Sequence, residues 1–166
     1  GKEFEIQPYG TEALSTLRIE MGHVAGSELD GRTIPHDASL EGLVSKKKDF
    51  IGKRSLTRRD TVREDRKQLV GIIPLDKSEF IEEGEHVVEC ETLPKTITTP
   101  IEYLGHISSS YHSPNLNHCI AMAMIKGGNK MLGRKLFVST SNGTKNIPVE
   151  VVNPVFIDPE NKRLVS

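Results

Sequence analysis

The spacing of apolar and polar residues changes near residue 68. After this point, short apolar runs alternate with clusters of Gly, Pro and Asn, as in β-strands joined by turns. These runs are QLVGIIPL, HVVEC, IEYLGHISSSY, CIAMAMI, KLFVST and IPVEVVNPVF. Their intervals are typical of a β-barrel. Both faces of CIAMAMI (119–125) are apolar, so we expect it to be a central strand.

Before residue 68 the pattern predicts helix and loop. Thr11 is expected to be the N-cap of an amphipathic helix that runs to about Met21, with Gly22 as its stop. A second short helix is expected near Phe50, in FIGKRSLTRR. The first 66 residues hold too few apolar elements to close a core alone. We therefore expect them to be the later part of a larger domain.

Glu20 occupies an unusual place on the first predicted helix. With about 100° per residue, it lies roughly 60° from Leu17, at the flank of an apolar face that also holds Leu14 and Met21. A buried carboxylate is costly unless hydrogen-bond donors converge on it. A salt bridge with Arg18 at the helix end is one possible source of donors, and a bound ligand is the other.

Composition narrows the function classes. With 36% hydrophobic and 27% charged residues the chain fits a soluble globular protein. Its net charge of −1 gives no overall electrostatic case for a nucleic acid or an anionic membrane as partner. No apolar run approaches the length of a membrane span and no signal-peptide pattern is present. We expect a cytoplasmic protein.

Cysteine and histidine spacing predicts no metal site. Cys90 and Cys119 lie far apart without CxxC spacing, and we expect both to be buried or half-buried. His106, His112 and His118 are close in sequence but lack a supporting cysteine or carboxylate pattern. No Ser/His/Asp or Cys/His catalytic set can be assembled with specificity.

Several stretches, in order along the chain, resemble one family. They are YGTEALSTLRIEMGHVAGSELDGRTIPHDASL, SKKKDFIGKRSL, QLVGI, GHISSSYHSPNLNHCIAMAMIKGG and VVNPVFIDPENKRL. Together they resemble the carboxy-terminal portion of the alpha subunit of heterotetrameric sarcosine oxidase. That portion is similar to aminomethyltransferase, the folate-using T-protein of the glycine cleavage system. SKKKDFIGKRSL and GHVAGSELDGRT favour the sarcosine oxidase branch.

The resemblance implies an α+β fold in two parts. Residues 1–66 would be the end of an aminomethyltransferase-like folate-binding domain, and residues 67–166 a carboxy-terminal β-barrel. The family's alpha subunit also binds NAD, and other subunits carry flavins. This chain has no GxGxxG fingerprint for a dinucleotide. The implied cofactor of this region is tetrahydrofolate, and the implied partners are the other sarcosine oxidase subunits.

The resemblance also implies site residues. Glu20 matches the glutamate of the family's LRxExG motif, which binds the pterin ring. A carboxylate can accept hydrogen bonds from two adjacent N–H groups of an aminopyrimidine. Lys48 aligns with the basic residue that contacts the glutamate tail of folate, although a solvated basic face is the alternative. Tyr111 is expected to pack either on the cofactor or in the barrel rim. The catalytic aspartate of aminomethyltransferases falls outside the matched region, so we expect no catalytic residue here and no turnover from the chain alone.

In the family, sarcosine is oxidatively demethylated to glycine and the one-carbon unit passes to tetrahydrofolate. The sequence leaves three other functions open. One is another folate-dependent enzyme: aminomethyltransferase, dimethylglycine oxidase or a sulfoniopropionate demethylase. Another is an iron–sulfur assembly factor, whose GCYxGQE-like motif differs from DFIGKRS here. A third is a subunit-docking module that uses the acidic block from Asp76 to Glu91.

Overall fold

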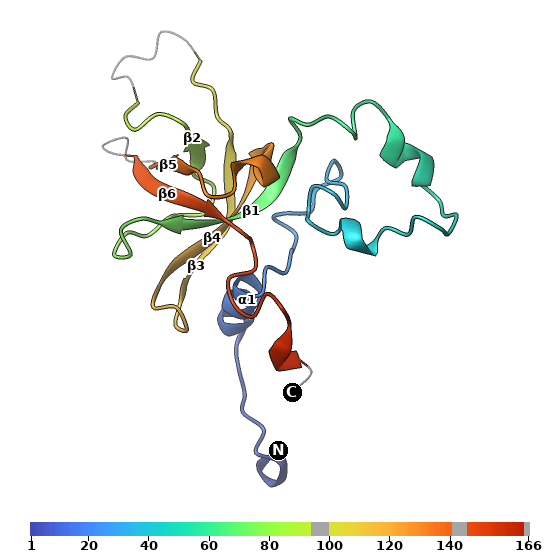
Figure 1. Ribbon diagram of the computed structural model, residues 1–166. Helices are drawn as coiled ribbons and strands as arrows, with labels where there is room; N and C mark the ends of the chain where they lie inside the picture. Colours follow the sequence, from blue (N-terminus) through green and yellow to red (C-terminus); the bar gives the residue numbers. More distant parts are fainter. Residues whose placement is uncertain (94–99, 141–145, 165–166) are drawn as a thin grey trace.

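Six antiparallel strands close into a β-barrel in the order β1-β4-β3-β2-β5-β6 (Figure 1). The computed structural model describes residues 1–93, 100–140 and 146–164. The strands are β1 (Lys67–Pro74), β2 (His86–Val88), β3 (Gly105–Ser113), β4 (His118–Lys126), β5 (Lys135–Ser139) and β6 (Ile147–Val152). Each overlaps one of the apolar runs, so the predicted barrel is confirmed.

Helices are few. They are α1 (Thr11–Glu20) and the short 3-10 helices η1 (Lys2–Phe4), η2 (Glu41–Leu43), η3 (Lys53–Thr57), η4 (Gly128–Met131) and η5 (Lys162–Leu164). In the described part of the chain, no helix is long and apolar enough to cross a bilayer.

Strand β4 explains how the barrel is filled. It pairs with β1 on one side and β3 on the other, as expected of a central strand. Three of its four inward residues are small, namely Cys119, Ala121 and Ala123, and the fourth is Ile125. Its outward residues are large, with Ile120 and Met122 in a second apolar cluster on the outer surface. Alternation along a strand therefore builds two cores from one apolar run.

Helix α1 covers part of this outer cluster, but with a different face from the one predicted. Ile19 and Glu20 are buried, whereas Leu14 and Leu17 remain 53% and 50% exposed. Burial is confined to the last turn because only this end of the helix reaches β3 and β4. The predicted N-cap was also wrong by one position, since Thr11 is already helical and Gly10 is the cap.

The end of α1 is fixed by the chain that follows β6. Gly22 has a positive φ of 67°, and a Cβ there would lie 2.7 Å from the carbonyl oxygen of Pro154. The backbone N–H groups of Phe156 and Ile157 donate to the carbonyl oxygen of Glu20, at 3.0 and 2.9 Å. These contacts satisfy a helix-end carbonyl and hold Glu20 in place.

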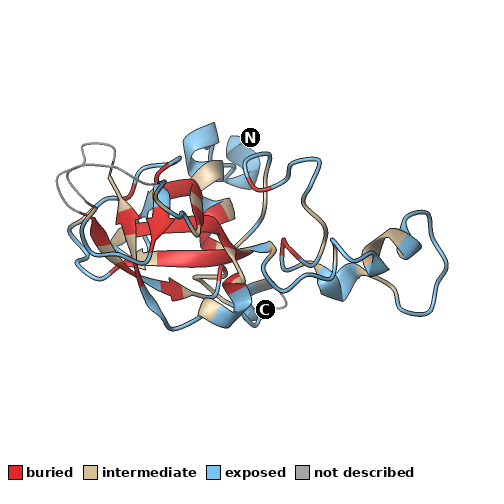
Figure 2. Ribbon diagram, turned by 90° about the horizontal axis from the view of Figure 1, so that it is seen from above, coloured by how far each residue is buried: buried red, intermediate tan, exposed pale blue. Residues whose placement is uncertain are grey.

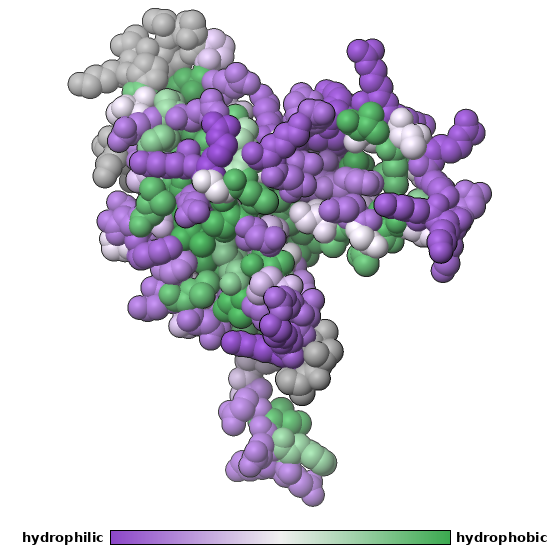
Figure 3. Space-filling view, viewed as in Figure 1, coloured by the Kyte–Doolittle hydropathy of each residue, from purple (hydrophilic) through white to green (hydrophobic). Residues whose placement is uncertain are grey.

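Residues 41–62 form an arm that extends away from the barrel (Figure 1). Figure 2 shows that exposed residues dominate this arm, whereas buried residues concentrate in the barrel. The second short helix expected near Phe50 is present only as the 3-10 helix η3, which begins at Lys53. It has no buried face to stabilise a longer helix, and Ile51 is fully exposed. Most of the arm's surface is hydrophilic (Figure 3).

The two cysteines differ. Cys119 is buried inside the barrel as expected, but Cys90 is exposed just after β2, so that part of the prediction was wrong.

Candidate functional site

Glu20 is 2% exposed although it ends a helix whose other turns face solvent. One carboxylate oxygen accepts a hydrogen bond from the hydroxyl of Ser113. The other accepts one from the side-chain amide of Asn115, at 2.8 Å. Both donors come from the end of β3 and the turn that follows it. Within the described residues no arginine or lysine contacts Glu20, so the expected alternative of a salt bridge with Arg18 is wrong.

Arg18 belongs instead to a buried network centred on Glu28. Its guanidinium donates to Glu28 Oε2 at 3.1 Å and to Ser109 Oγ at 2.7 Å. Ser109 Oγ donates to Glu28 Oε1 at 2.7 Å, and the backbone N–H of Ala25 donates to Glu28 Oε2 at 2.8 Å. The network ties α1, the following loop and β3 together. Sequence reasoning missed Glu28, because GSELDG reads locally as a turn.

A β-bulge in β3 makes this arrangement possible. The register with β4 shifts between Ile107 and Ser109. After the shift, Ser109 lies opposite Met122 and Tyr111 opposite Ile120, both of which point outward from the barrel. The bulge therefore directs Ser109, Tyr111 and Ser113 toward the surface that α1 covers. Sequence pattern gave no sign of it.

Tyr111 and Glu20 lie on the same surface, whereas Lys48 does not. Tyr111 is half-buried and packs against the outer cluster that contains Ile19. Lys48 is exposed on the arm, where its carbonyl oxygen accepts a hydrogen bond from Lys53 Nζ at 2.7 Å. The chain thus brings two of the three expected site residues together.

A second charge cluster joins the loop after α1 to the start of β1. Arg66 donates to both carboxylate oxygens of Asp37, with Nε–Oδ1 at 2.9 Å and Nη2–Oδ2 at 2.5 Å. Its Nη2 also donates to the carbonyl oxygen of Arg32 at 2.8 Å. The hydrogen bonds with Asp37 raise the pKa of Arg66 despite partial burial. A bidentate pair of this kind fixes orientation as well as charge.

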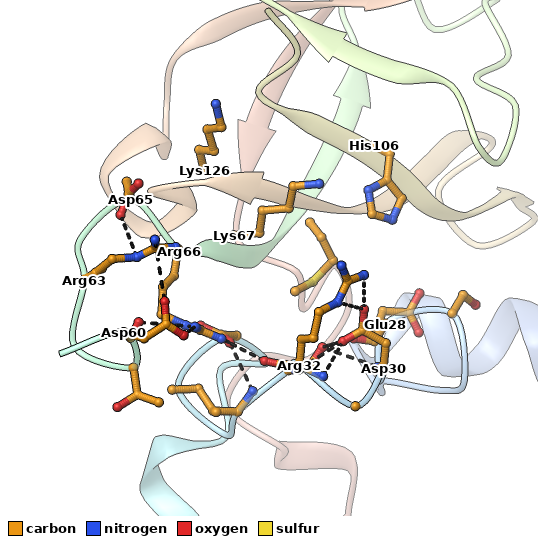
Figure 4. Close-up of a pocket in the computed structure, with 17 residues that line it drawn as sticks. Glu28, Asp30, Arg32, Asp60, Arg63, Asp65, Arg66, Lys67, His106 and Lys126 are labelled. Carbon is orange, nitrogen blue, oxygen red and sulfur yellow. Dashed lines mark hydrogen bonds and ion pairs between the residues drawn. The ribbon is translucent and has the colours of Figure 1, made fainter. Parts of the chain in front are cut away.

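A cleft of about 660 Å³ opens beside this cluster (Figure 4). It is lined by Ser27, Glu28, Asp30, Gly31, Arg32, Thr33, Ile34, Asp37, Asp60, Thr61, Arg63, Asp65, Arg66, Lys67, His106, Met124 and Lys126. Glu20 does not line it.

Two groups in the cleft have shifted pKa values. Burial lowers the pKa of His106, and the nearby basic groups Lys67 and His86 lower it further, against a smaller opposing effect of Asp30 and Glu28. Hydrogen bonds from Arg32 lower the pKa of Asp30 to about 2. At neutral pH the cleft therefore presents a largely neutral His106 and an ionised Asp30.

Over the described residues, no three His, Cys, Asp or Glu side chains converge as a metal ion would require. His106, His112 and His118 in particular do not form such a group.

Comparison with known proteins agrees with the barrel. The family model for the glycine cleavage T-protein C-terminal barrel domain matches residues 67–158. The sarcosine oxidase alpha subunit of Corynebacterium sp. (strain U-96) is 42% identical over 98% of this chain and 17% of its own length. That of Rhizobium meliloti (strain 1021) is 39% identical over 99% and 16%. This chain thus spans about a sixth of these relatives.

A solved structure shows the same fold. Aminomethyltransferase T of the Bartonella henselae glycine cleavage system superposes with a TM-score of 0.70 at 23% identity, over 88% of this chain and 38% of that one. The closed barrel and the matched family model together assign the chain: it belongs to the glycine cleavage T-protein C-terminal barrel family.

Proposed function

We propose that this chain forms part of the folate site of a sarcosine oxidase alpha subunit, with Glu20 as the ligand of the pterin ring. Similarity to sarcosine oxidase alpha subunits along nearly the whole chain supports this assignment. In this proposal residues 1–66 end the folate-binding domain and residues 67–166 form the carboxy-terminal barrel domain. The other subunits are its partners, in the cytoplasm, and carry the flavins, while NAD binds elsewhere in the alpha subunit.

The burial of the Glu20 carboxylate among neutral donors carries the proposal. Buried carboxylates usually face a cation, because burial of an unpaired charge is costly. Among the described residues, the donors to the Glu20 carboxylate are the Ser113 hydroxyl and the Asn115 amide. Each carboxylate oxygen can accept two hydrogen bonds, so acceptor capacity remains. A glutamine would satisfy Ser113 and Asn115 almost as well, and the charge is therefore better explained by a ligand with adjacent N–H groups.

The chain's own residues would hold and orient this carboxylate. The hydrogen bonds from Phe156 and Ile157 fix the backbone of Glu20. Asn115 is exposed, so its amide can move aside for a ligand without disturbing the core. Tyr111 would contribute the neighbouring apolar surface, and Lys48 a contact with the glutamate tail.

When bound, tetrahydrofolate supplies amine nitrogens that accept the one-carbon unit from oxidised sarcosine. The contribution of this chain is positional: it places the acceptor and excludes water from one side of it. We propose no catalytic residue within the chain.

Isothermal titration of tetrahydrofolate into the complete native protein tests the assignment. Glu20→Gln replaces an acceptor by a donor toward the pterin and should weaken binding by about 1.5–3 kcal/mol, or roughly 10- to 150-fold. Glu12→Gln is the matched control, because Glu12 is exposed on the same helix. Equal affinity of the Glu20 and Glu12 variants would refute the proposal.

A docking role is the second candidate. The connection between β1 and β2 carries exposed acidic side chains, Glu82 and Glu83, and the half-exposed Phe80. Such a surface suits a basic subunit face. Two results together would favour docking over the folate site. Binding of a flavin subunit would weaken steeply with added salt and in Glu82→Lys, and Glu20→Gln would leave folate affinity unchanged.

A further inference from the structure

The carboxylates that line the cleft beside the barrel are all paired with arginine side chains. Each of its acidic side chains lies within ion-pair or hydrogen-bond reach of an arginine. The pairs are Glu28 with Arg18, Asp30 with Arg32, Asp37 with Arg66, Asp60 with Arg63 and Arg66, and Asp65 with Arg63. Every acidic group of the cleft is thus already paired with an arginine, and none of them forms an ion pair with Lys67 or His106.

Lys67 and His106 have no hydrogen-bond or ion-pair partner among the residues that the structure describes. Figure 4 shows the Lys67 side chain extending toward the His106 ring. Both come from the outer face of the barrel: His106 lies opposite Met124 across the β3–β4 ladder, and Lys67 lies opposite Lys126 across the β1–β4 ladder. A lysine ammonium and an imidazole thus lie near each other, and neither forms an ion pair with a carboxylate among the described residues.

The pairing of Lys67 with Lys126 across the sheet places a second positive charge next to Lys67. Like charges directly opposite each other in a sheet are destabilising. Lys126 is relieved by a 2.8 Å bond with Glu102, which is exposed and lies outside the cleft. No acidic side chain among the described residues forms a comparable ion pair with Lys67. An anion in front of it would remove the repulsion.

We propose that Lys67 and His106 bind a carboxylate group in this cleft, with Lys67 Nζ and an imidazole N–H donating one hydrogen bond to each oxygen. This site is distinct from Glu20 and does not rest on the proposed folate function. Its ligand class is a small monocarboxylate.

Charge balance favours one negative charge over two. The cleft is lined by five carboxylates and five arginine or lysine side chains, so it is formally neutral while His106 is neutral. A single carboxylate with protonation of His106 restores neutrality. A phosphate dianion would leave an excess negative charge beside Glu28 and Asp30, which already flank the imidazole. The volume of about 660 Å³ is within the range of small-molecule sites.

The site should depend on pH. His106 faces Lys67 from β1, His86 from β2, and Glu28 and Asp30 from the loop after α1. In the free protein burial and the two basic neighbours hold the His106 pKa below its usual value. A bound carboxylate raises that pKa, so binding takes up a proton. Affinity should therefore fall as the pH rises from 5 to 8.

The probe is propionate, added to the complete native protein with ¹³Cε1-labelled histidine. The chain has six histidines, and the resonance of His106 is assigned by its loss in His106→Gln. The expected result is a saturable rise in the His106 pKa with propionate, absent with sodium chloride at the same ionic strength. Lys67→Gln should weaken this response about tenfold or more, the usual value of a charge-assisted bond.

Lys77→Gln is the matched control, because Lys77 is exposed in the acidic β1–β2 connection and its loss changes net charge equally. A response that is unchanged in Lys67→Gln, or equally reduced in Lys77→Gln, would overturn the site. A response to chloride equal to that of propionate would do the same. Inorganic phosphate binding as tightly as propionate would overturn the assignment to a monocarboxylate.

Discussion

Removing Arg18 should destabilise the protein more than neutralising Glu28. The Glu28 side chain is fully buried, whereas that of Arg18 is 19% exposed. Arg18→Met leaves a buried carboxylate with only Ser109 and the Ala25 N–H as donors, which costs about 3–5 kcal/mol. Glu28→Gln keeps an acceptor oxygen and leaves a guanidinium that reaches water, which costs about 1.5–3 kcal/mol.

Urea unfolding followed by far-UV circular dichroism measures this difference. Arg58→Met is the control, because Arg58 is exposed on the arm and its side chain has no ion pair among the described residues. That variant should lie within about 0.5 kcal/mol of the unsubstituted protein. The reasoning is refuted if Arg18→Met unfolds at the same urea concentration as Arg58→Met. It is also refuted if Glu28→Gln is the less stable of the two network variants, since this would mean that the arginine is the more costly group to leave unpaired.

Three further outcomes follow from the same contacts. Gly105→Ala should lower the midpoint of thermal unfolding by several degrees, because its Cβ would lie 2.0 Å from a carbonyl oxygen of β4. Asp37→Asn should cost about 1.5–3 kcal/mol in urea unfolding by weakening the bidentate pair with Arg66, and an unchanged midpoint would contradict this. NMR titration should place the Asp30 pKa near 2, and Arg32→Gln should move that pKa toward 3.8. Because the pKa is lower in the folded protein, ionised Asp30 stabilises the fold above about pH 4, and this contribution is lost as the pH falls toward 2.

The barrel could be predicted from sequence because strand periodicity is local. In β4 small and large apolar residues alternate from Cys119 to Met124, and this alternation separates the interior face from the outer one. The apolar face of α1 was equally visible, yet it was misassigned: which part of a helix is buried depends on where the helix meets the barrel. Leu14 and Leu17 illustrate this, since only the last turn of α1 makes that contact.

The site depends on contacts between residues far apart in the chain. Glu20 was identifiable as an unusual carboxylate, but its donors lie 93 and 95 residues away. Ser109 reaches Glu28 across 81 residues, and only because β3 contains a bulge. Neither pairing has a signature in local sequence, and both follow from the closure of the barrel against α1.

A crystal structure of the complete native protein with bound tetrahydrofolate tests the central claim most directly. Our account predicts that both Glu20 carboxylate oxygens lie within about 3.2 Å of N–H groups of the pterin ring, with Ser113 still bonded to the carboxylate. A pterin ring bound elsewhere, while Glu20 keeps only Ser113 and Asn115, would contradict it.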